Sequence, residues 1–148
     1  MNRLPGIITT IDRCGSIALI DVAAAGHQLT ATLVDASGQA QLWQTGMAVT
    51  LMFAETDVAL AKDLSGRISM RNRIHATVRE IEHGQILSKV VFEACGHRLQ
   101  SIITTRSTVS LALQVGDRVE ALIKANEMSV VAADAPCVAG QDSIQADA

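Results

Sequence analysis

The residues with the clearest chemical potential form two short strings rich in polar donors. Residues 67–72 read Arg-Ile-Ser-Met-Arg-Asn, and residues 123–126 read Ile-Lys-Ala-Asn. Arg and Lys supply positive charge, Ser a hydroxyl donor and Asn an amide donor, while a small Ala lets backbone N–H groups approach a ligand. A tetrahedral oxyanion needs donors of this kind converging from several directions. The strings therefore predict an oxyanion site, against the alternative that these residues form an ordinary solvated strand face.

A repeat of 70 residues organises the chain that carries these strings. Shifting the sequence by that length aligns residues 2–4 with 72–74 and residues 26–29 with 96–99, without a gap. Residues 2–62 share eleven identities with their counterparts, and most other pairs keep their apolar or polar character. An ungapped register of this length indicates two structurally related units.

The repeat divides the chain into three parts. We expect a first unit at residues 1–64, a second at residues 65–132, and a disordered tail at residues 133–148. The tail is small, polar and acidic and shows no periodicity. Residues 2–62 carry three basic and five acidic groups, whereas residues 63–132 carry nine basic and seven acidic groups. An anion is therefore expected to bind to the second unit.

The pattern within each unit is mainly that of β-strands. In the second unit, residues 74–82 and 86–94 alternate between apolar and polar positions, a return strand is expected at residues 99–104, and Cys95-Gly96 is expected to form the hairpin turn. Thr104 or Thr105 can cap a short helix from Arg106 to Leu113. Five strands and one short helix per unit predict an all-β protein made of tandem, OB-like five-stranded barrels.

Composition argues against several classes of function. The 148 residues have a net charge of -3 and only 2% aromatic residues, which argues against nucleic-acid binding. No run of about 18 apolar residues occurs, and the N-terminus lacks the apolar stretch of a secretory signal, so no membrane insertion is expected. Three cysteines without framework spacing favour a reducing compartment, and the expected location is the cytoplasm.

No catalytic site is expected either. The serines lack a G-x-S-x-G context, and the four histidines fall in predicted turns or on an exposed strand face. Cys95 and His97 could form a pair of metal ligands, but no second pair accompanies them, so no metal-cation site is expected.

The combination of these strings within one β-rich unit resembles the molybdate-binding Mop domain, which is of the TOBE type. The unit begins with Ser-Met-Arg-Asn at residues 69–72, continues with a G-x-x-L-x-S-I-I-T segment at residues 96–104, and closes with V-x-A-L-I-K-A-N-x-M-S-V at residues 119–130. The tandem arrangement is similar to that of the di-Mop molbindins, which are small cytoplasmic binders of molybdate and tungstate. The resemblance implies OB-like barrels, a homo-oligomer and oxyanions bound at interfaces between units. A homotrimer would reproduce the six units of the family's rings, and a dimer is the alternative.

The resemblance also implies which side chains hold the anion. The candidates are donors from the two strings and from the segment before the short helix: Ser69, Met70 through its backbone amide, Arg71, Asn72, Thr104, Lys124, Ala125 and Asn126.

The first unit departs from this pattern. It has no equivalents of Ser69 and Arg71, it replaces Lys124 with Ala54 and Thr104 with Val34, and it adds Glu55, which would repel a dianion. We therefore expect the first unit to be a structural partner and the second to bind.

The predicted function is reversible binding of molybdate, and of tungstate, for storage, homeostasis or sensing. Two alternatives remain at this point. The ending of the first unit resembles the TOBE region of molybdate-importer ATPases, so the chain could be a regulatory module of a transporter; an OB-fold nucleic-acid binder is the other alternative.

Overall fold

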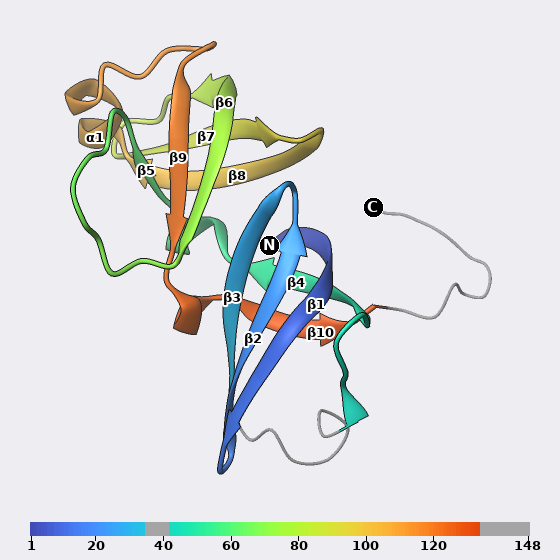
Figure 1. The fold of residues 1–148 in the computed structure, drawn as a ribbon. Coiled ribbons are helices and arrows are strands. Elements are labelled where there is room, and N and C mark those ends of the chain that lie inside the picture. The colour runs from blue at the N-terminus through green and yellow to red at the C-terminus, as the bar shows by residue number, and fades with distance from the viewer. Residues whose placement is uncertain (35–41, 134–148) are drawn as a thin grey trace.

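The structure is a computed structural model that describes residues 1–34 and 42–133. Within these residues the chain forms two five-stranded antiparallel sheets, each curled on itself, and the second lies above the first in Figure 1. The all-β, OB-like fold is thereby confirmed. The strands of the first half are β1 (Asn2–Cys14), β2 (Ile17–Ala24), β3 (His27–Val34), β4 (Ala48–Phe53) and β5 (Ala59–Ala61). Those of the second half are β6 (Asn72–Glu82), β7 (Leu87–Ala94), β8 (His97–Thr104), β9 (Arg118–Ile123) and β10 (Ser129–Ala132).

The two halves exchange their last strands. The first sheet has the order β10-β4-β1-β2-β3 and the second the order β5-β9-β6-β7-β8. Val130 of β10 pairs with Leu51, and Leu60 of β5 pairs with Ala121. Each barrel is therefore completed by a strand from the other sequence repeat, so the sheets cross the boundary that the repeat places near residue 64.

The local geometry repeats as the sequence does. The hairpin turn at Cys95-Gly96 has positive φ at both residues (48° and 81°), and its counterpart Ala25-Gly26 has 51° and 77°. Two-residue turns of this kind match the twist of the strands that they connect. β1 is interrupted by a register shift between Ile8 and Thr10, and β6 by the equivalent shift between Val78 and Glu80. The prediction of two related units is consistent with this repeated geometry.

One apolar core runs through both barrels. Phe53 and Phe92, the only phenylalanines, are 1% and 0% exposed, and Val58 and Met128 are buried just before the exchanged strands begin. Because these residues belong to one continuous cluster, the barrels are packed as a single body.

The helix α1 (Thr105–Ser110) follows β8, as predicted, but ends before Leu113. The ammonium group of Lys62 donates to the carbonyls of Leu111 and Ala112 at 2.9 and 3.2 Å, and to a carboxylate oxygen of Asp117 at 3.0 Å. A cation at this position satisfies carbonyls that a helix C-terminus leaves free. The residue that caps the helix thus comes from the segment after β5.

Two further predictions lie outside the described residues. The short helix expected in the first unit falls largely on residues 35–41, and all but the first residue of the expected tail falls on residues 134–148.

Candidate functional site

The two predicted strings meet at one end of the second barrel. Asn72, the first residue of β6, pairs with Ile123, the last residue of β9. Arg71 precedes this pair and Lys124 follows it, so the antiparallel register places the two basic residues at neighbouring strand ends. Both side chains are exposed, and among the residues that the structure describes neither forms an ion pair with a carboxylate. This end of the barrel therefore offers two cations to an external anion.

The remaining members of the strings surround this end. Ser69 is exposed and Met70 is half-buried in the segment that leads into β6. Lys124 stands immediately before the 3-10 helix η3 (Ala125–Glu127), which contains Ala125 and the exposed Asn126. One chain thus brings together a hydroxyl, two basic groups and the backbone of two tight segments.

Asn72 has a second, structural role. Its side chain is 0% exposed; its carbonyl oxygen accepts the N–H of Thr30 at 2.7 Å, and its amide donates to the carbonyl of Thr30 at 2.9 Å. Asn2 does the same to Gln100 of the second barrel, at 2.8 Å for both bonds. The two asparagines therefore act as clamps that join each barrel to the edge strand of the other. Any contact of Asn72 with an anion would have to come from its second amide hydrogen alone.

Thr104 lies at the other end of the barrel. Thr104 is the last residue of β8 and pairs with Leu87, the first residue of β7. Two residues further along β7, Lys89 pairs with Glu82, the last residue of β6, so Thr104 lies near the end of β6 and not near its start at Asn72. Its hydroxyl accepts the N–H of Ser107 at 3.1 Å and so forms the N-cap of α1, which confirms the predicted cap. Within one chain, Thr104 is therefore not brought next to Arg71 and Lys124.

Ser107 is a polar residue near a predicted site residue that inspection of the sequence missed. Its hydroxyl oxygen lies 2.8 Å from that of Thr104. The available signal was the spacing Thr-x-x-Ser at residues 104–107, which is that of a helix cap with a polar third residue.

The first unit holds a carboxylate at the equivalent place. Glu55 corresponds to Ala125 in the repeat, and Met1 corresponds to Arg71. The amino group of Met1 donates to Glu55 at 2.5 Å, and this bond, followed by one from its own backbone N–H, lowers the pKa of Glu55 below its usual value. A negative group already occupies this part of the first unit, which disfavours an anion there.

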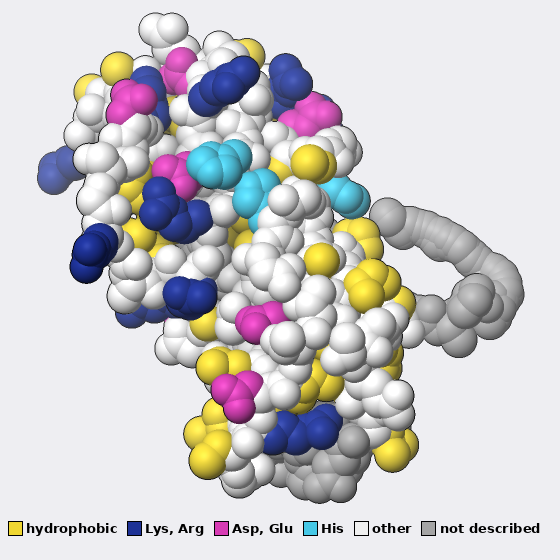
Figure 2. All heavy atoms as spheres, in the orientation of Figure 1, with side chains coloured by type: hydrophobic (Ala, Val, Ile, Leu, Met, Phe, Trp, Pro, Cys, Tyr) yellow, Lys and Arg dark blue, Asp and Glu magenta, His cyan; other side chains and the backbone are white. Residues whose placement is uncertain are grey.

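Basic side chains gather over the second barrel. Figure 2 shows that, on the face in view, most of the Lys and Arg side chains lie over the upper half of the molecule, which Figure 1 identifies as the second barrel. This distribution agrees with the excess of basic residues in residues 63–132.

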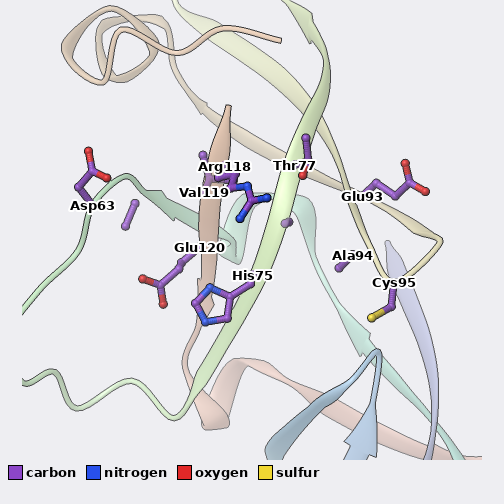
Figure 3. A pocket seen from close by; sticks show the side chains of 11 residues that line it. Asp63, His75, Thr77, Glu93, Ala94, Cys95, Arg118, Val119 and Glu120 are labelled. Carbon is purple, nitrogen blue, oxygen red and sulfur yellow. The ribbon is translucent and has the colours of Figure 1, made fainter. Parts of the chain in front are cut away.

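A separate hollow of about 440 Å³ lies on the outer face of the second sheet (Figure 3). Its walls include three carboxylates, those of Asp63, Glu93 and Glu120, together with Arg118 and His75. Carboxylates at close range repel a dianion, so this hollow is less suited to an oxyanion than the strand ends are.

The ion pair beside this hollow predicts how stability depends on pH. Arg73 Nε and Nη2 donate to the two oxygens of Glu120 at 2.8 and 3.1 Å, and this hydrogen bonding is the main reason that the pKa of Glu120 lies below its ordinary value. A lowered pKa means that the unfolded chain binds the proton more readily. The stabilisation is therefore present at neutral pH and is lost as the pH falls below about 4.3 and through the lowered pKa.

Substituting Glu120→Gln should therefore flatten the acid limb of the stability curve. We expect the thermal midpoint of the wild-type protein to fall more steeply than that of the variant as the pH is lowered below about 4.3. Glu127→Gln, which alters an exposed carboxylate of η3, is the matched control and should follow the wild type. Parallel curves for wild type and Glu120→Gln would contradict the assignment.

Within the described residues, no helix is long and apolar enough to cross a membrane. The same part of the chain contains no group of three or more His, Cys, Asp or Glu residues arranged to hold a metal ion.

Comparisons with known proteins agree with this geometry. Residues 68–130 match the family model of the TOBE domain. The chain is 38% identical over 123 residues to the molybdenum import ATP-binding protein ModC of Brucella abortus, and 27% identical over 132 residues to the molybdenum transport protein ModE of Herbaspirillum seropedicae. These matches cover 82% and 87% of the chain, which spans only 32% of ModC and 49% of ModE.

A solved structure extends the similarity to the whole fold. The cytoplasmic molybdate-binding protein ModG, in a crystal form with molybdate bound, superimposes with a TM-score of 0.84 at 26% sequence identity. The match covers 89% of this chain and 96% of ModG, so both barrels take part in it.

Proposed function

Because the chain belongs to the Mop (TOBE) domain family, we propose that it binds molybdate and that its second unit supplies the binding residues. The observation that carries the proposal is the register of β6 and β9, which sets Arg71 and Lys124 side by side without a carboxylate partner among the described residues. A dianion at this place would meet two positive charges and the donors of the adjoining segments.

The proposed ligand set follows from this arrangement. Charge-assisted hydrogen bonds each contribute about 1.5–3 kcal/mol, so four or five of them support micromolar or tighter binding. The donors are the hydroxyl of Ser69, the backbone amides of Met70 and Ala125, and the side chains of Arg71 and Lys124. Asn126 is exposed beside them and is a weaker candidate.

We further propose that a complete site needs a second copy of the chain. Thr104 lies at the far end of the barrel, so a threonine hydroxyl can reach the anion held by Arg71 and Lys124 only if another copy presents it. The first unit offers Val34 and Ala54 at the equivalent positions and cannot replace these donors. A homotrimer is the favoured assembly and a dimer is the alternative. Counting bound molybdenum per chain, together with the mass in solution, tests both points.

Size should make the site selective among oxyanions. Donors spaced for molybdate leave some unpaired around a smaller anion, and unpaired donors are costly. In parallel calorimetric titrations we expect molybdate and tungstate to bind and sulfate to bind at least about tenfold more weakly. Equal affinity for sulfate, or no heat with molybdate, would contradict the proposal. Salt-dependent binding of RNA or single-stranded DNA would instead support the nucleic-acid alternative.

The biological role that follows is binding without chemical conversion. The protein would hold molybdate in the cytoplasm for storage, homeostasis or sensing, and no bond is made or broken. The similarity to ModC favours a second candidate, a regulatory module of a molybdate transporter. A change in the ATPase rate of such a transporter when the chain is added would support this second role.

A further inference from the structure

A long connection between β5 and β6 carries part of the proposed anion site. It comprises residues 63–71, here called the strap, and includes Ser69, Met70 and Arg71. We propose that the strap closes over a bound oxyanion and opens to release it, while Lys124 keeps its place at the end of β9. The inference rests on the proposed function, because it concerns how the proposed molybdate site is completed.

Hydrogen bonds anchor the chain on both sides of the strap. Lys62 holds the preceding residue to the end of α1, and Asn72 holds the following residue to β3. Within the part of the chain that the structure describes, no residue of the strap forms a hydrogen bond or an ion pair. Only Leu64 and Met70 are half-buried, and the other strap residues are exposed. A segment with so little bonding opens locally at a small cost in free energy.

The strap is also longer than the distance that it has to span. β5 and β6 flank β9 on opposite sides, and the register pairs Ala61 with Glu120 and Asn72 with Ile123. Two strand spacings across β9 and three residues along it separate Ala61 from Asn72 by about 14 Å. The chain between these two residues reaches about 36 Å when extended. Figure 1 shows the connection as a wide loop, and this surplus lets the strap move without disturbing either strand.

The part of the site on β9 is fixed by contrast. Lys124 directly follows the strand, and its carbonyl accepts the N–H of Glu127 at 3.0 Å. The N–H of Met128 donates to the carbonyl of Ala125 at 3.3 Å, and the Met128 side chain is 1% exposed in the core. Because the turn is tied to the core in this way, Lys124 presents its charge from a fixed position.

The donors of the strap differ in their freedom to move. Arg71 is joined directly to the clamped Asn72, whereas Ser69 and Met70 lie further from this anchor. We therefore expect Lys124 and Arg71 to capture the anion first, and the hydroxyl of Ser69 and the N–H of Met70 to turn toward it afterwards. Neither of these two donors has a partner among the described residues, so their hydrogen bonds to the anion favour the closed strap.

Amide hydrogen exchange of the full-length chain, measured by mass spectrometry, tests the closure. Without ligand, the amides of residues 64–68 should exchange at nearly the rate of an unstructured chain, because none of them donates a hydrogen bond to a described residue. Saturating sodium molybdate should slow them at least about tenfold, although the proposed ligands are residues 69–71. Gly15 and Ser16, which are exposed in the β1–β2 turn, are the internal control and should be unaffected. Sodium sulfate is the control anion.

A lengthened strap tests whether the site depends on a preset loop. We choose an insertion of Gly-Ser-Gly-Ser after Gly66, because a Cβ added there would meet no described atom within 4 Å. Molybdate binding should weaken only about twofold, since the cost of closing a loop rises slowly with its length. A loop that holds its donors in a preset shape would lose much more. Arg71→Ala in the lengthened chain should still weaken binding about tenfold, and thermal midpoints without molybdate check that both variants fold.

The outcomes distinguish this inference from the proposed function. Suppose that the wild type binds molybdate. Unchanged exchange at residues 64–68, slow exchange there before molybdate is added, or a loss of about fivefold or more on insertion would then overturn the closure and leave the proposed function standing. A wild-type protein that does not bind molybdate would overturn both.

Discussion

Replacing Lys124 with alanine is expected to weaken molybdate binding by about tenfold or more. Lys124 is exposed at the end of β9, and the β-register places it next to Arg71. Loss of one charge-assisted hydrogen bond to a dianion corresponds to about 1.5–3 kcal/mol, and each 1.4 kcal/mol is a factor of ten in affinity. Arg71→Ala should have an effect of the same order. Titration calorimetry measures both.

The first unit forms the same turn with alanine at the equivalent position. Ala54 occupies the equivalent place in the first unit, before the 3-10 helix η2 (Glu55–Asp57). Its backbone has φ -74° and ψ 147°, compared with -67° and 146° for Lys124. Because the same turn forms without the lysine, a loss of affinity in Lys124→Ala can be assigned to the lost charge and not to a changed backbone.

The control for this experiment removes a charge from elsewhere in the same sheet. Arg118 begins β9, whereas Lys124 follows its end, and Arg118 lines the separate hollow of Figure 3. Arg118→Ala should bind molybdate within about twofold of the wild type, because exposed charges at this separation are screened by salt. Equal losses in Lys124→Ala and Arg118→Ala would indicate a general effect of charge and would contradict a site at the strand ends.

Local features of the second unit could be predicted from the sequence because local interactions determine them. The hairpin turn at Cys95-Gly96 is predictable because glycine readily adopts the positive φ that such a turn requires. The start of α1 is predictable because the hydroxyl of Thr104 can accept a hydrogen bond from a free backbone N–H of the first helical turn. The alternation in residues 74–82 correctly separates buried Ala76 and Val78 from the outward residues. Arg71 and Lys124 lie close together because β6 and β9, the first and last long strands of the second unit, pair with each other.

The exchange of strands could not be predicted in the same way. β5 contains only Ala-Leu-Ala, and β10 only four residues, so neither pattern specifies which sheet it joins. Lys62 caps a helix that begins more than 40 residues later, and no local spacing connects it to Asp117. The clamp formed by Asn72 is hidden for the same reason, since its partner Thr30 lies in the other repeat. Inspection of the sequence assigned Asn72 to the anion, whereas the fold uses its carboxamide between the barrels.

The clamp formed by Asn72 predicts a large loss of stability when this residue is replaced. Asn72→Asp should lower the free energy of unfolding by about 3–5 kcal/mol at neutral pH. The substituted carboxylate would be buried, could still accept the N–H of Thr30, but would face the carbonyl oxygen of Thr30 without a hydrogen to donate. Asn72→Ala leaves both groups of Thr30 unpaired without adding a charge, and the expected loss is about 2–4 kcal/mol.

Acid should partly rescue the aspartate variant, and this distinguishes it from a simple packing defect. A protonated carboxyl regains a donor for the carbonyl of Thr30, so the difference between Asn72→Asp and the wild type should narrow as the pH falls, whereas that of Asn72→Ala should not. The matched control is Asn126→Asp, the same substitution at an exposed position, with an expected change within about 0.5 kcal/mol. Urea unfolding between neutral pH and about pH 4 measures these three variants together with Asn2→Asp. Equal stabilities for Asn72→Asp and Asn126→Asp would show that the hydrogen bonds to Thr30 do not hold the barrels together. A loss of stability in Asn2→Asp similar to that in Asn72→Asp would show that both asparagine clamps do so.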